Sequence, residues 1–116
     1  MVWIALSSWS KTRRMLVANR DGVTVGYALA ELAEDQEIVL YMLYVDPNCK
    51  SQGIGSALLD ATATSYRNAK SMRLEVLQNN TAAVDWYRAK RFEIYGETKN
   101  ATGTNGVPAF YMQKML

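Results

Sequence analysis

The sequence predicts a single α+β domain, α/β in the broader sense, whose mixed central sheet has about six strands. Alternating or continuous apolar residues predict three successive strands within residues 15–45. Two segments with helical spacing then each follow a strand, and two more strands complete the chain. The predicted order over residues 1–116 is β-β-β-α-β-α-β-β, which is typical of one mixed domain rather than a repeat or a helical bundle.

The composition of the 116 residues is that of an ordinary globular protein, with 49% hydrophobic and 21% charged residues. The formal net charge of +2 is too small to indicate a nucleic-acid partner without a basic cluster. Since no stretch of about 18 consecutive apolar residues occurs, we expect no membrane-spanning segment.

Cysteine and histidine usage narrows the chemistry further. The single cysteine, Cys49, excludes an internal disulfide framework and favours a reducing compartment, so a cytoplasmic location is expected. The absence of histidine removes the commonest general base and metal ligand. Catalytic triads that depend on histidine and most zinc sites are therefore excluded, and no metal is expected.

The first half of the chain is predicted to form antiparallel strands. Residues 15–19 and 23–33 are apolar or alternating, and they flank a turn in which Gly22 is free to adopt a positive φ. Residues 38–45 are continuously apolar, which predicts a strand covered on both faces. Residues 1–13 are expected to form a short helix or strand.

The second half of the chain alternates helices with strands. Apolar residues at helical spacing predict a helix over residues 54–69. A second helix is predicted over residues 82–90, with Asn80 or Thr81 able to cap its first turn. Three strands complete this half, at residues 72–78, 92–98 and 109–116.

The segment between the third strand and the first helix, Lys50-Ser51-Gln52-Gly53-Ile54-Gly55, is typical of an anion-binding loop. Glycines let the backbone approach an anion, and the amides that open a helix point toward it with the helix dipole behind them. A triphosphate loop needs lysine and serine or threonine directly after its last glycine, and a dinucleotide loop needs glycine at position 58; neither is present. Alone, such a Gly-x-Gly is more often a tight turn than a ligand site.

Two motifs together resemble the GCN5-related N-acetyltransferase (GNAT) superfamily. The segment LYVDPNCKSQGIGSALL (43–59) is similar to that family's acetyl-CoA-binding motif, in which a strand ending in Val-x-Pro runs into a basic residue or glutamine, Gly-x-Gly and a helix. The segment LEVLQNNTAAVDWYRAKRF (74–92) resembles the family's next motif, and FYMQKML (110–116) resembles its last strand. The resemblance covers residues 14–116.

The resemblance implies the GNAT acyl-CoA acyltransferase fold, with the sheet splayed at the third and fourth strands. It also implies an acetyl-CoA-dependent N-acetyltransferase, with acetyl-CoA as co-substrate and an amine of a small molecule or peptide as acceptor. Loop amides would hold the pyrophosphate, and the preceding strand would pair with the pantetheine arm. The implied binding residues are Leu43, Tyr44, Val45, Lys50, Ser51, Gln52, Gly53, Ile54, Gly55, Ser56, Asn80 and Tyr87.

The resemblance further implies direct attack of the amine on the thioester. Tyr87 would protonate the leaving thiolate, because a phenol with a pKa of about 10 remains protonated at neutral pH. A backbone amide near Val45 would polarise the carbonyl. Tyr41 and Met42 stand where many relatives carry an acidic residue, so Glu31 on the adjacent strand is the candidate base, with a surface role as its alternative.

Three further positions depart from the family pattern. Lys50 replaces arginine or glutamine, which keeps a charge but loses a bidentate donor. Arg91 stands where the family has glycine, which predicts a differently built turn after the second helix. Residues 1–13 replace the usual amino-terminal helices, so the acceptor pocket is expected to be open or completed by a second subunit, and a homodimer is favoured.

A second class of function is compatible with the same residues. The short amino-terminal segment and the missing strand carboxylate leave open a non-catalytic acyl-CoA-binding or dimeric regulatory protein of this fold. Release of thiol from acetyl-CoA in the presence of an amine distinguishes the two classes.

Overall fold

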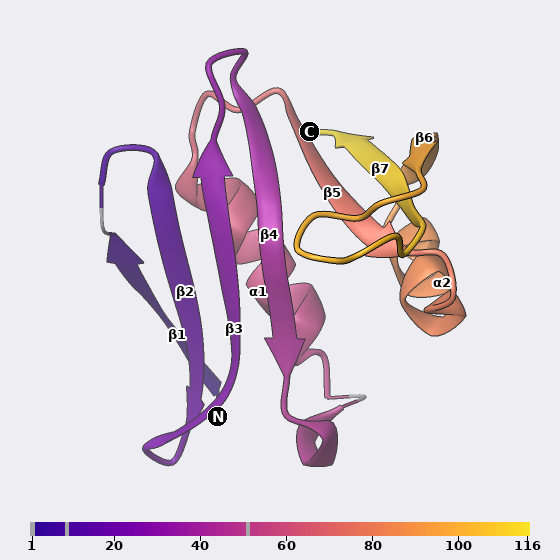
Figure 1. Ribbon diagram of the computed structural model, residues 1–116. Coiled ribbons are helices and arrows are strands. Elements are labelled where there is room, and N and C mark those ends of the chain that lie inside the picture. The colour runs from indigo at the N-terminus through magenta and orange to yellow at the C-terminus, as the bar shows by residue number, and fades with distance from the viewer. Residues whose placement is uncertain (1, 9, 51) are drawn as a thin grey trace.

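The computed structural model describes residues 2–8, 10–50 and 52–116. Over these residues the chain forms one mixed seven-stranded sheet, in the order β1-β2-β3-β4-β5-β7-β6, with α1 packed behind its first strands (Figure 1). In chain order the elements are β1 (Val2–Ser8), β2 (Arg13–Arg20), β3 (Val23–Leu32), β4 (Glu37–Val45), the 3-10 turn η1 (Pro47–Cys49), α1 (Ile54–Ser65), β5 (Ser71–Leu77), α2 (Thr81–Ala89), β6 (Glu93–Thr98) and β7 (Ala109–Met115).

The predicted α+β fold and its element order are confirmed, with one strand added. Residues Val2–Ser8, expected to be a short helix or strand, form β1 and pair antiparallel with β2 from Val2 opposite Arg20 to Ser8 opposite Arg14. The sheet therefore has seven strands rather than about six. Val2 and Ile4 are partly buried against the main core, and this contact holds one face of the added strand.

The hairpin between β2 and β3 forms as its turn sequence predicts. Arg20 pairs with Val23, which leaves a two-residue loop of Asp21 and Gly22. Both have positive φ, 51° and 81°, as a type I′ turn requires. Glycine adopts this conformation without a steric penalty, so Gly22 fixes the register of the first antiparallel strands.

Small residues on β3 allow α1 to pack closely against the sheet. Gly26, Ala28 and Ala30 are all buried, and the side chains of Ile54 and Leu58 lie over Gly26. A Cβ atom placed on Gly26 would lie 3.1 Å from Leu58 and only 2.7 Å from the backbone oxygen of Tyr44. The glycine is therefore needed for the approach of both α1 and β4.

The helix α1 ends at Ser65, four residues before the predicted end at Ala69. Tyr66 leaves the helix with an extended ψ of 90°. Its buried hydroxyl donates to the backbone oxygens of Thr12, at 2.7 Å, and Ala30, at 3.2 Å. This long-range bond to the sheet competes with a further helical turn, and the sequence periodicity does not reveal it.

The sheet splays where β4 meets β5. The two strands are parallel and pair only from Glu37 opposite Ser71 to Leu40 opposite Leu74. Beyond Leu40 they diverge, as Figure 1 shows, while β4 continues to Val45 along β3 alone. The second half of β4 therefore has unpaired backbone groups on its β5 side.

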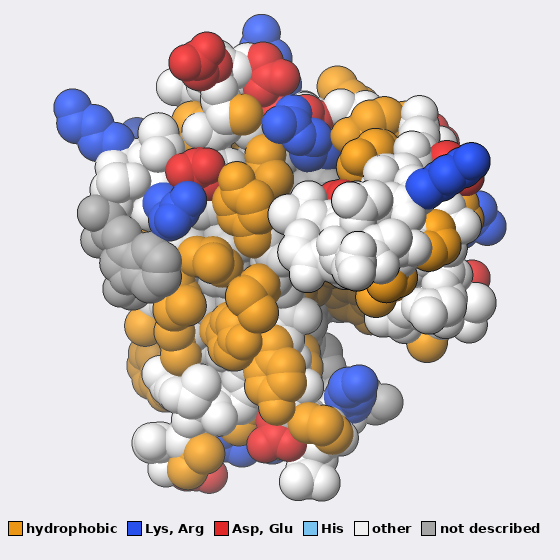
Figure 2. Space-filling model, in the orientation of Figure 1, with side chains coloured by type: hydrophobic (Ala, Val, Ile, Leu, Met, Phe, Trp, Pro, Cys, Tyr) orange, Lys and Arg blue, Asp and Glu red, His pale blue; other side chains and the backbone are white. Residues whose placement is uncertain are grey.

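The expectation that β4 is covered on both faces is wrong for this second half. Tyr41, Met42 and Tyr44 are 51%, 47% and 45% exposed. A shift in the pairing, from Ala30 opposite Leu40 to Leu29 opposite Met42, makes Tyr41 an extra residue that has no partner on β3. Because α1 covers one face, the other carries exposed apolar side chains, which gather along the front of the molecule in Figure 2.

A buried carboxylate anchors the paired end of β4. Glu37 is 6% exposed and accepts hydrogen bonds from Ser71 Oγ at 2.6 Å, from Arg73 at 2.5 Å and from the side-chain amide of Gln113. Burial alone would raise the pKa of Glu37, but these hydrogen bonds outweigh it and hold the pKa below its usual value of 4.5. The carboxylate thus ties β4, β5 and β7 together at the closed end of the splay.

Replacing Glu37 with glutamine is expected to lower the free energy of unfolding at neutral pH by about 1–3 kcal/mol, because three donors lose a charged acceptor. A carboxyl group with a lowered folded-state pKa stabilises the fold above its unfolded pKa and loses this effect as the pH falls through the folded value. The wild-type protein should therefore lose stability below pH 4.5, and Glu37→Gln should lose less. Urea titrations at neutral and acidic pH test this, with the exposed Glu34→Gln as control. Equal pH slopes in all three proteins would contradict it.

Candidate functional site

A cavity of about 640 Å³ lies between the end of β4, the start of α1 and one side of α2. Ten of the binding residues implied by the motifs line this cavity, and they come from segments that are far apart in sequence. These ten are Leu43, Tyr44, Val45, Lys50, Gly53, Ile54, Gly55, Ser56, Asn80 and Tyr87. Pro47, Cys49, Ala82, Ala83 and Trp86 complete its lining.

The glycine loop forms the floor of the cavity at the start of α1. Gly53 is the N-cap residue and has a φ of 77°, a conformation that glycine adopts without strain. Its carbonyl accepts from Ala57 at 3.0 Å, so the amides of the intervening first turn are without helical partners. These amides and the side chain of Lys50 make the floor suited to an anion.

One predicted loop residue, Gln52, is not part of the cavity lining. Gln52 is exposed, and its side-chain oxygen accepts a hydrogen bond from Arg20 at the end of β2. Ser51 lies outside the described residues. Arg20 also lies 3.9 Å from the sulfur of Cys49, so one guanidinium holds the loop at two points. No motif marks Arg20, because its partners lie 29 and 32 residues away.

The strand side of the cavity is the unpaired part of β4. Leu43, Tyr44 and Val45 pair with β3 on one side, whereas the pairing with β5 ends at Leu40. Their free backbone groups face the opening of the splay, and an extended amide-containing chain can pair with such an edge.

The first end of α2 contributes Asn80 to the wall of the cavity. Asn80 is the N-cap residue, and its Oδ1 accepts from the Ala83 amide at 3.2 Å, as the sequence allows. This bond uses only the oxygen, so the side-chain NH₂ is a donor at the cavity wall.

The turn that follows α2 corrects the expectation for Arg91. Arg91 has a φ of 73°, so it takes the left-handed conformation that a glycine would take, and the turn keeps that form. The Phe92 amide donates to the Tyr87 oxygen at 3.0 Å and the Arg91 amide to the Arg88 oxygen at 2.9 Å, the two bonds of a Schellman motif. The rings of Phe92 and Tyr87 then meet edge to face at 5.4 Å, which fixes the position of Tyr87.

Tyr87 presents a protonated phenol to the cavity. Burial raises the pKa of Tyr87 to about 12. Its ring lies between Trp86, at 5.1 Å, and Phe92, at 5.4 Å. Among the described residues none forms a hydrogen bond with its hydroxyl, which leaves the proton available to a bound molecule.

Trp86 lines the cavity but is not among the binding residues predicted from the sequence. Its ring lies over the start of α1, where a Cβ atom on Gly55 would be 3.2 Å from it. Gly55 therefore has a packing role in addition to its backbone amide. The sequence places Trp86 directly before Tyr87, but it does not indicate which helix the tryptophan contacts.

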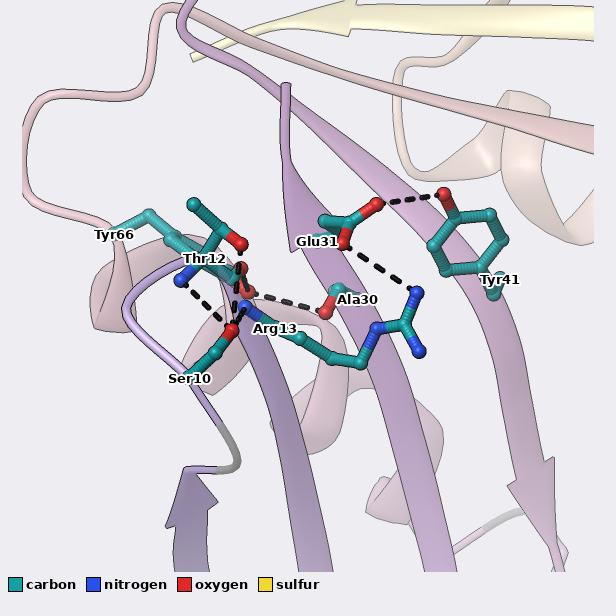
Figure 3. A network of polar contacts seen from close by, with 7 residues as sticks. All are labelled: Ser10, Thr12, Arg13, Ala30, Glu31, Tyr41 and Tyr66. Carbon is teal, nitrogen blue, oxygen red and sulfur yellow. Dashed lines mark hydrogen bonds and ion pairs between the residues drawn. The ribbon is translucent and has the colours of Figure 1, made fainter. Parts of the chain in front are cut away.

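Glu31 lies away from the cavity, on the face of the sheet opposite α1. Figure 3 shows its carboxylate between the guanidinium of Arg13, at 3.4 Å, and the hydroxyl of Tyr41, which donates to it at 3.1 Å. Burial and this hydrogen bond both raise the pKa of Tyr41, so its hydroxyl remains protonated. Glu31 is thus not brought next to Tyr87, and Tyr41 stands on the strand between them.

The described residues contain no group of three or more cysteine, aspartate or glutamate residues arranged to hold a metal ion. No helix among them is long and apolar enough to cross a membrane.

The family model for the acetyltransferase (GNAT) domain matches residues 5–116. The chain belongs to the GNAT acetyltransferase family. It is 34% identical, over 107 residues, to uncharacterized N-acetyltransferases of Mycobacterium tuberculosis and Mycobacterium bovis, an alignment that covers 90% of this chain and 68% of each relative.

Solved structures support the GNAT fold. Ard1 from Thermoplasma volcanium is 27% identical and superposes with a TM-score of 0.82, over 93% of this chain and 72% of Ard1. A Bacillus anthracis protein provisionally named a streptothricin acetyltransferase, solved in complex with acetyl coenzyme A, superposes with a TM-score of 0.83 over 99% of this chain and 85% of that chain. Its 15% identity shows a shared fold alone.

Proposed function

We propose that this GNAT protein transfers the acetyl group of acetyl-CoA to an amine of a small molecule or peptide. One observation carries the proposal: a single cavity gathers the glycine loop, the unpaired end of β4 and Tyr87. These three parts match the three parts of the co-substrate, which are an anionic pyrophosphate, an amide-containing arm and a thioester.

The co-substrate is held by backbone more than by side chains. The amides of Gly53, Gly55 and Ser56 bind the pyrophosphate, and Lys50 adds a positive charge. The pantetheine arm pairs with residues 43–45 as an added strand, because this edge has no partner beyond Leu40. The side-chain amide of Asn80 contacts the same arm.

Acetyl transfer then requires only one proton donor from the cavity. The neutral amine attacks the carbonyl carbon, whose oxygen is polarised by the backbone amide near Val45. As the carbon–sulfur bond breaks, the Tyr87 hydroxyl gives its proton to the coenzyme A thiolate. A pKa of about 12 keeps this hydroxyl protonated until the thiolate forms. Solvent exchange restores the phenol after the products leave.

Glu31 is the proposed acceptor for the proton that the amine loses. Its carboxylate is hydrogen-bonded to Tyr41, so a proton reaches it along the Tyr41 hydroxyl rather than by direct contact. An amine that arrives neutral needs no protein base, because the proton that its nitrogen loses after the attack passes to solvent, and Glu31→Gln distinguishes the two routes. A loss of activity that is largest at low pH supports the relay, whereas no loss at any pH removes Glu31 from the reaction.

We also propose that two copies associate through the exposed apolar face of β1–β4, in the cytoplasm of the cell. Trp3, Met42 and Tyr44 are between 45% and 70% exposed, and an isologous contact would bury them. Sedimentation equilibrium is expected to give twice the chain mass, and a monomer at micromolar concentration would contradict the dimer.

The direct test of acetyl transfer mixes the protein with acetyl-CoA and a panel of small amines, amino acids and peptides. Free thiol and the mass of the acetylated acceptor are measured together, because thiol release alone also reports hydrolysis. Transfer to at least one amine is expected. Thermal stabilisation by acetyl-CoA without transfer to any acceptor would favour the alternative, a non-catalytic acyl-CoA-binding or regulatory protein.

A further inference from the structure

A second cavity, of about 530 Å³, lies on the other side of the splay between β4 and β5. Its walls include the tyrosines of three strands, Tyr41 on β4, Tyr95 on β6 and Tyr111 on β7. Thr102, from the loop between β6 and β7, borders it, and this loop crosses in front of β5 in Figure 1. None of the motif residues assigned to acetyl-CoA lines it.

The two cavities share β4 and are lined by successive stretches of this strand. Residues 39–41 line the second cavity and residues 43–45 line the first. Leu43 pairs with Ala28, which faces α1, whereas the Tyr41 side chain reaches Glu31 on the face away from α1. The cavities therefore approach each other where β4 leaves β5, and a molecule in each would meet through the opening of the splay.

The walls of the second cavity favour a positively charged organic group. The rings of Tyr95 and Tyr111 are stacked, with centroids 6.0 Å apart and planes at 28°. Tyr95 and Tyr41 are about half exposed, so their ring faces are accessible from the cavity. Aromatic faces attract cations and are a poor environment for carboxylates.

The charges around the cavity favour a cation as well. Its one cationic lining residue, among those described, is Arg73, which is held by Glu37 at 2.5 Å and by Asp35 at 3.7 Å. Two further carboxylates lie nearby: Glu75 lines the cavity, and Glu31 accepts from Tyr41. Arg13 offsets Glu31. The region around the cavity thus contains four carboxylates and two guanidinium groups, which gives it an excess of negative charge.

We propose that this cavity binds the acyl acceptor and that it selects primary amines with a second cationic group at their far end. The reacting amine lies at the opening toward the thioester, and the second cation lies between Glu75 and the Tyr95–Tyr111 pair. This inference rests on the proposed acetyl transfer, and it adds the class of acceptor and the residues that select it.

A matched series of acceptors tests the selectivity. The compounds 1,5-diaminopentane, 5-aminopentan-1-ol and 5-aminopentanoate have one chain length and differ in a distal group that is cationic, neutral or anionic. The kcat/KM for the diamine is expected to exceed that for the amino alcohol by about 10-fold, with the anionic compound poorest. Equal values for the diamine and the amino alcohol would overturn the inference while leaving acetyl transfer intact.

Variants locate the selectivity in the cavity. Glu75→Gln removes the charge but keeps an oxygen for the Thr102 amide, which now donates to Glu75 at 3.3 Å. It is expected to reduce the diamine preference several-fold, and Tyr95→Leu is expected to do the same. Asp60→Asn makes an equal charge change on an exposed position of α1 and should leave the preference unchanged. A preference that is unaltered in both cavity variants would overturn the assignment.

A binding measurement separates this inference from the proposed reaction. Pentane-1,5-bis(trimethylammonium) cannot be acetylated, and its binding is followed by thermal shift and by tyrosine resonances in NMR spectra. Binding to the wild-type protein that is weakened in Tyr95→Leu supports the cation site even if no acceptor is acetylated. Absence of binding at millimolar concentration would overturn the site even if acetyl transfer is found.

Discussion

Tyr87→Phe is expected to lower the turnover of acetyl transfer by about 100-fold or more, because the leaving thiolate loses its proton donor. The affinity for acetyl-CoA should stay nearly the same, since the phenylalanine ring keeps the contacts with Trp86 and Phe92. Steady-state kinetics gives the turnover, and calorimetry with acetyl-CoA gives the affinity. Unchanged turnover would remove Tyr87 from the mechanism, and a loss of affinity alone would make it a binding residue.

Two comparisons sharpen this test. Tyr27→Phe removes a phenol from the face of the sheet away from α1, where the ring contacts Tyr44, and should leave the turnover unchanged. The pH profile is the second comparison. Because burial raises the pKa of Tyr87 to about 12, the wild-type rate should not fall near pH 10 through loss of this proton. A fall near pH 10 that is absent in Tyr87→Phe would show that the hydroxyl titrates normally.

Gly26→Ala should destabilise the fold by about 1–3 kcal/mol and weaken acetyl-CoA binding by about 10-fold. The added methyl group would lie 2.7 Å from the backbone oxygen of Tyr44, so β4 has to move away from β3. Tyr44 belongs to the free edge of β4 that is proposed to pair with pantetheine. A displacement of β4 should therefore also weaken the binding of acetyl-CoA. Urea denaturation measures the stability, and calorimetry measures the affinity.

Gly96→Ala is the matched control for Gly26→Ala. It also adds one methyl group to a glycine in a strand, but its nearest neighbour, at 3.3 Å, is the ring of Tyr111 rather than a backbone atom. A side chain can rotate away, so the loss of stability should be smaller and the affinity for acetyl-CoA unchanged. Equal losses in the two variants would show that the spacing of β3 and β4 is not what holds the co-substrate.

Local sequence signals predicted the elements that depend on near neighbours. The Asp21–Gly22 turn, the cap at Asn80 and the Gly53 start of α1 each require one backbone conformation that few residues favour. Arg91 shows the limit of such signals. An arginine at this position predicted a turn without a left-handed residue. Arg91 nevertheless has the left-handed conformation, because the Schellman hydrogen bonds and the Tyr87–Phe92 contact stabilise it.

Long-range contacts decided the features that the sequence pattern did not predict. The apolar run over β4 suggested burial on both faces, but burial depends on which elements cover the strand, and β5 leaves it after Leu40. The early end of α1 depends on hydrogen bonds from Tyr66 to residues 36 and 54 positions away. These contacts join residues that are much farther apart in sequence than the few adjacent residues that define a helical or strand periodicity.

The sequence by itself determined the family, the order of the elements after β1 and ten of the residues that line the first cavity, because glycine conformation, capping and strand alternation are properties of adjacent residues. Only the tertiary structure decided that the Glu31 carboxylate lies next to the Tyr41 hydroxyl, and that three tyrosines and Glu75 line a second cavity. Those side chains come from separate strands, and their juxtaposition follows from the sheet order and the splay between β4 and β5. The residues that would choose the acceptor are therefore set by strand pairing across the whole sheet rather than by any contiguous motif.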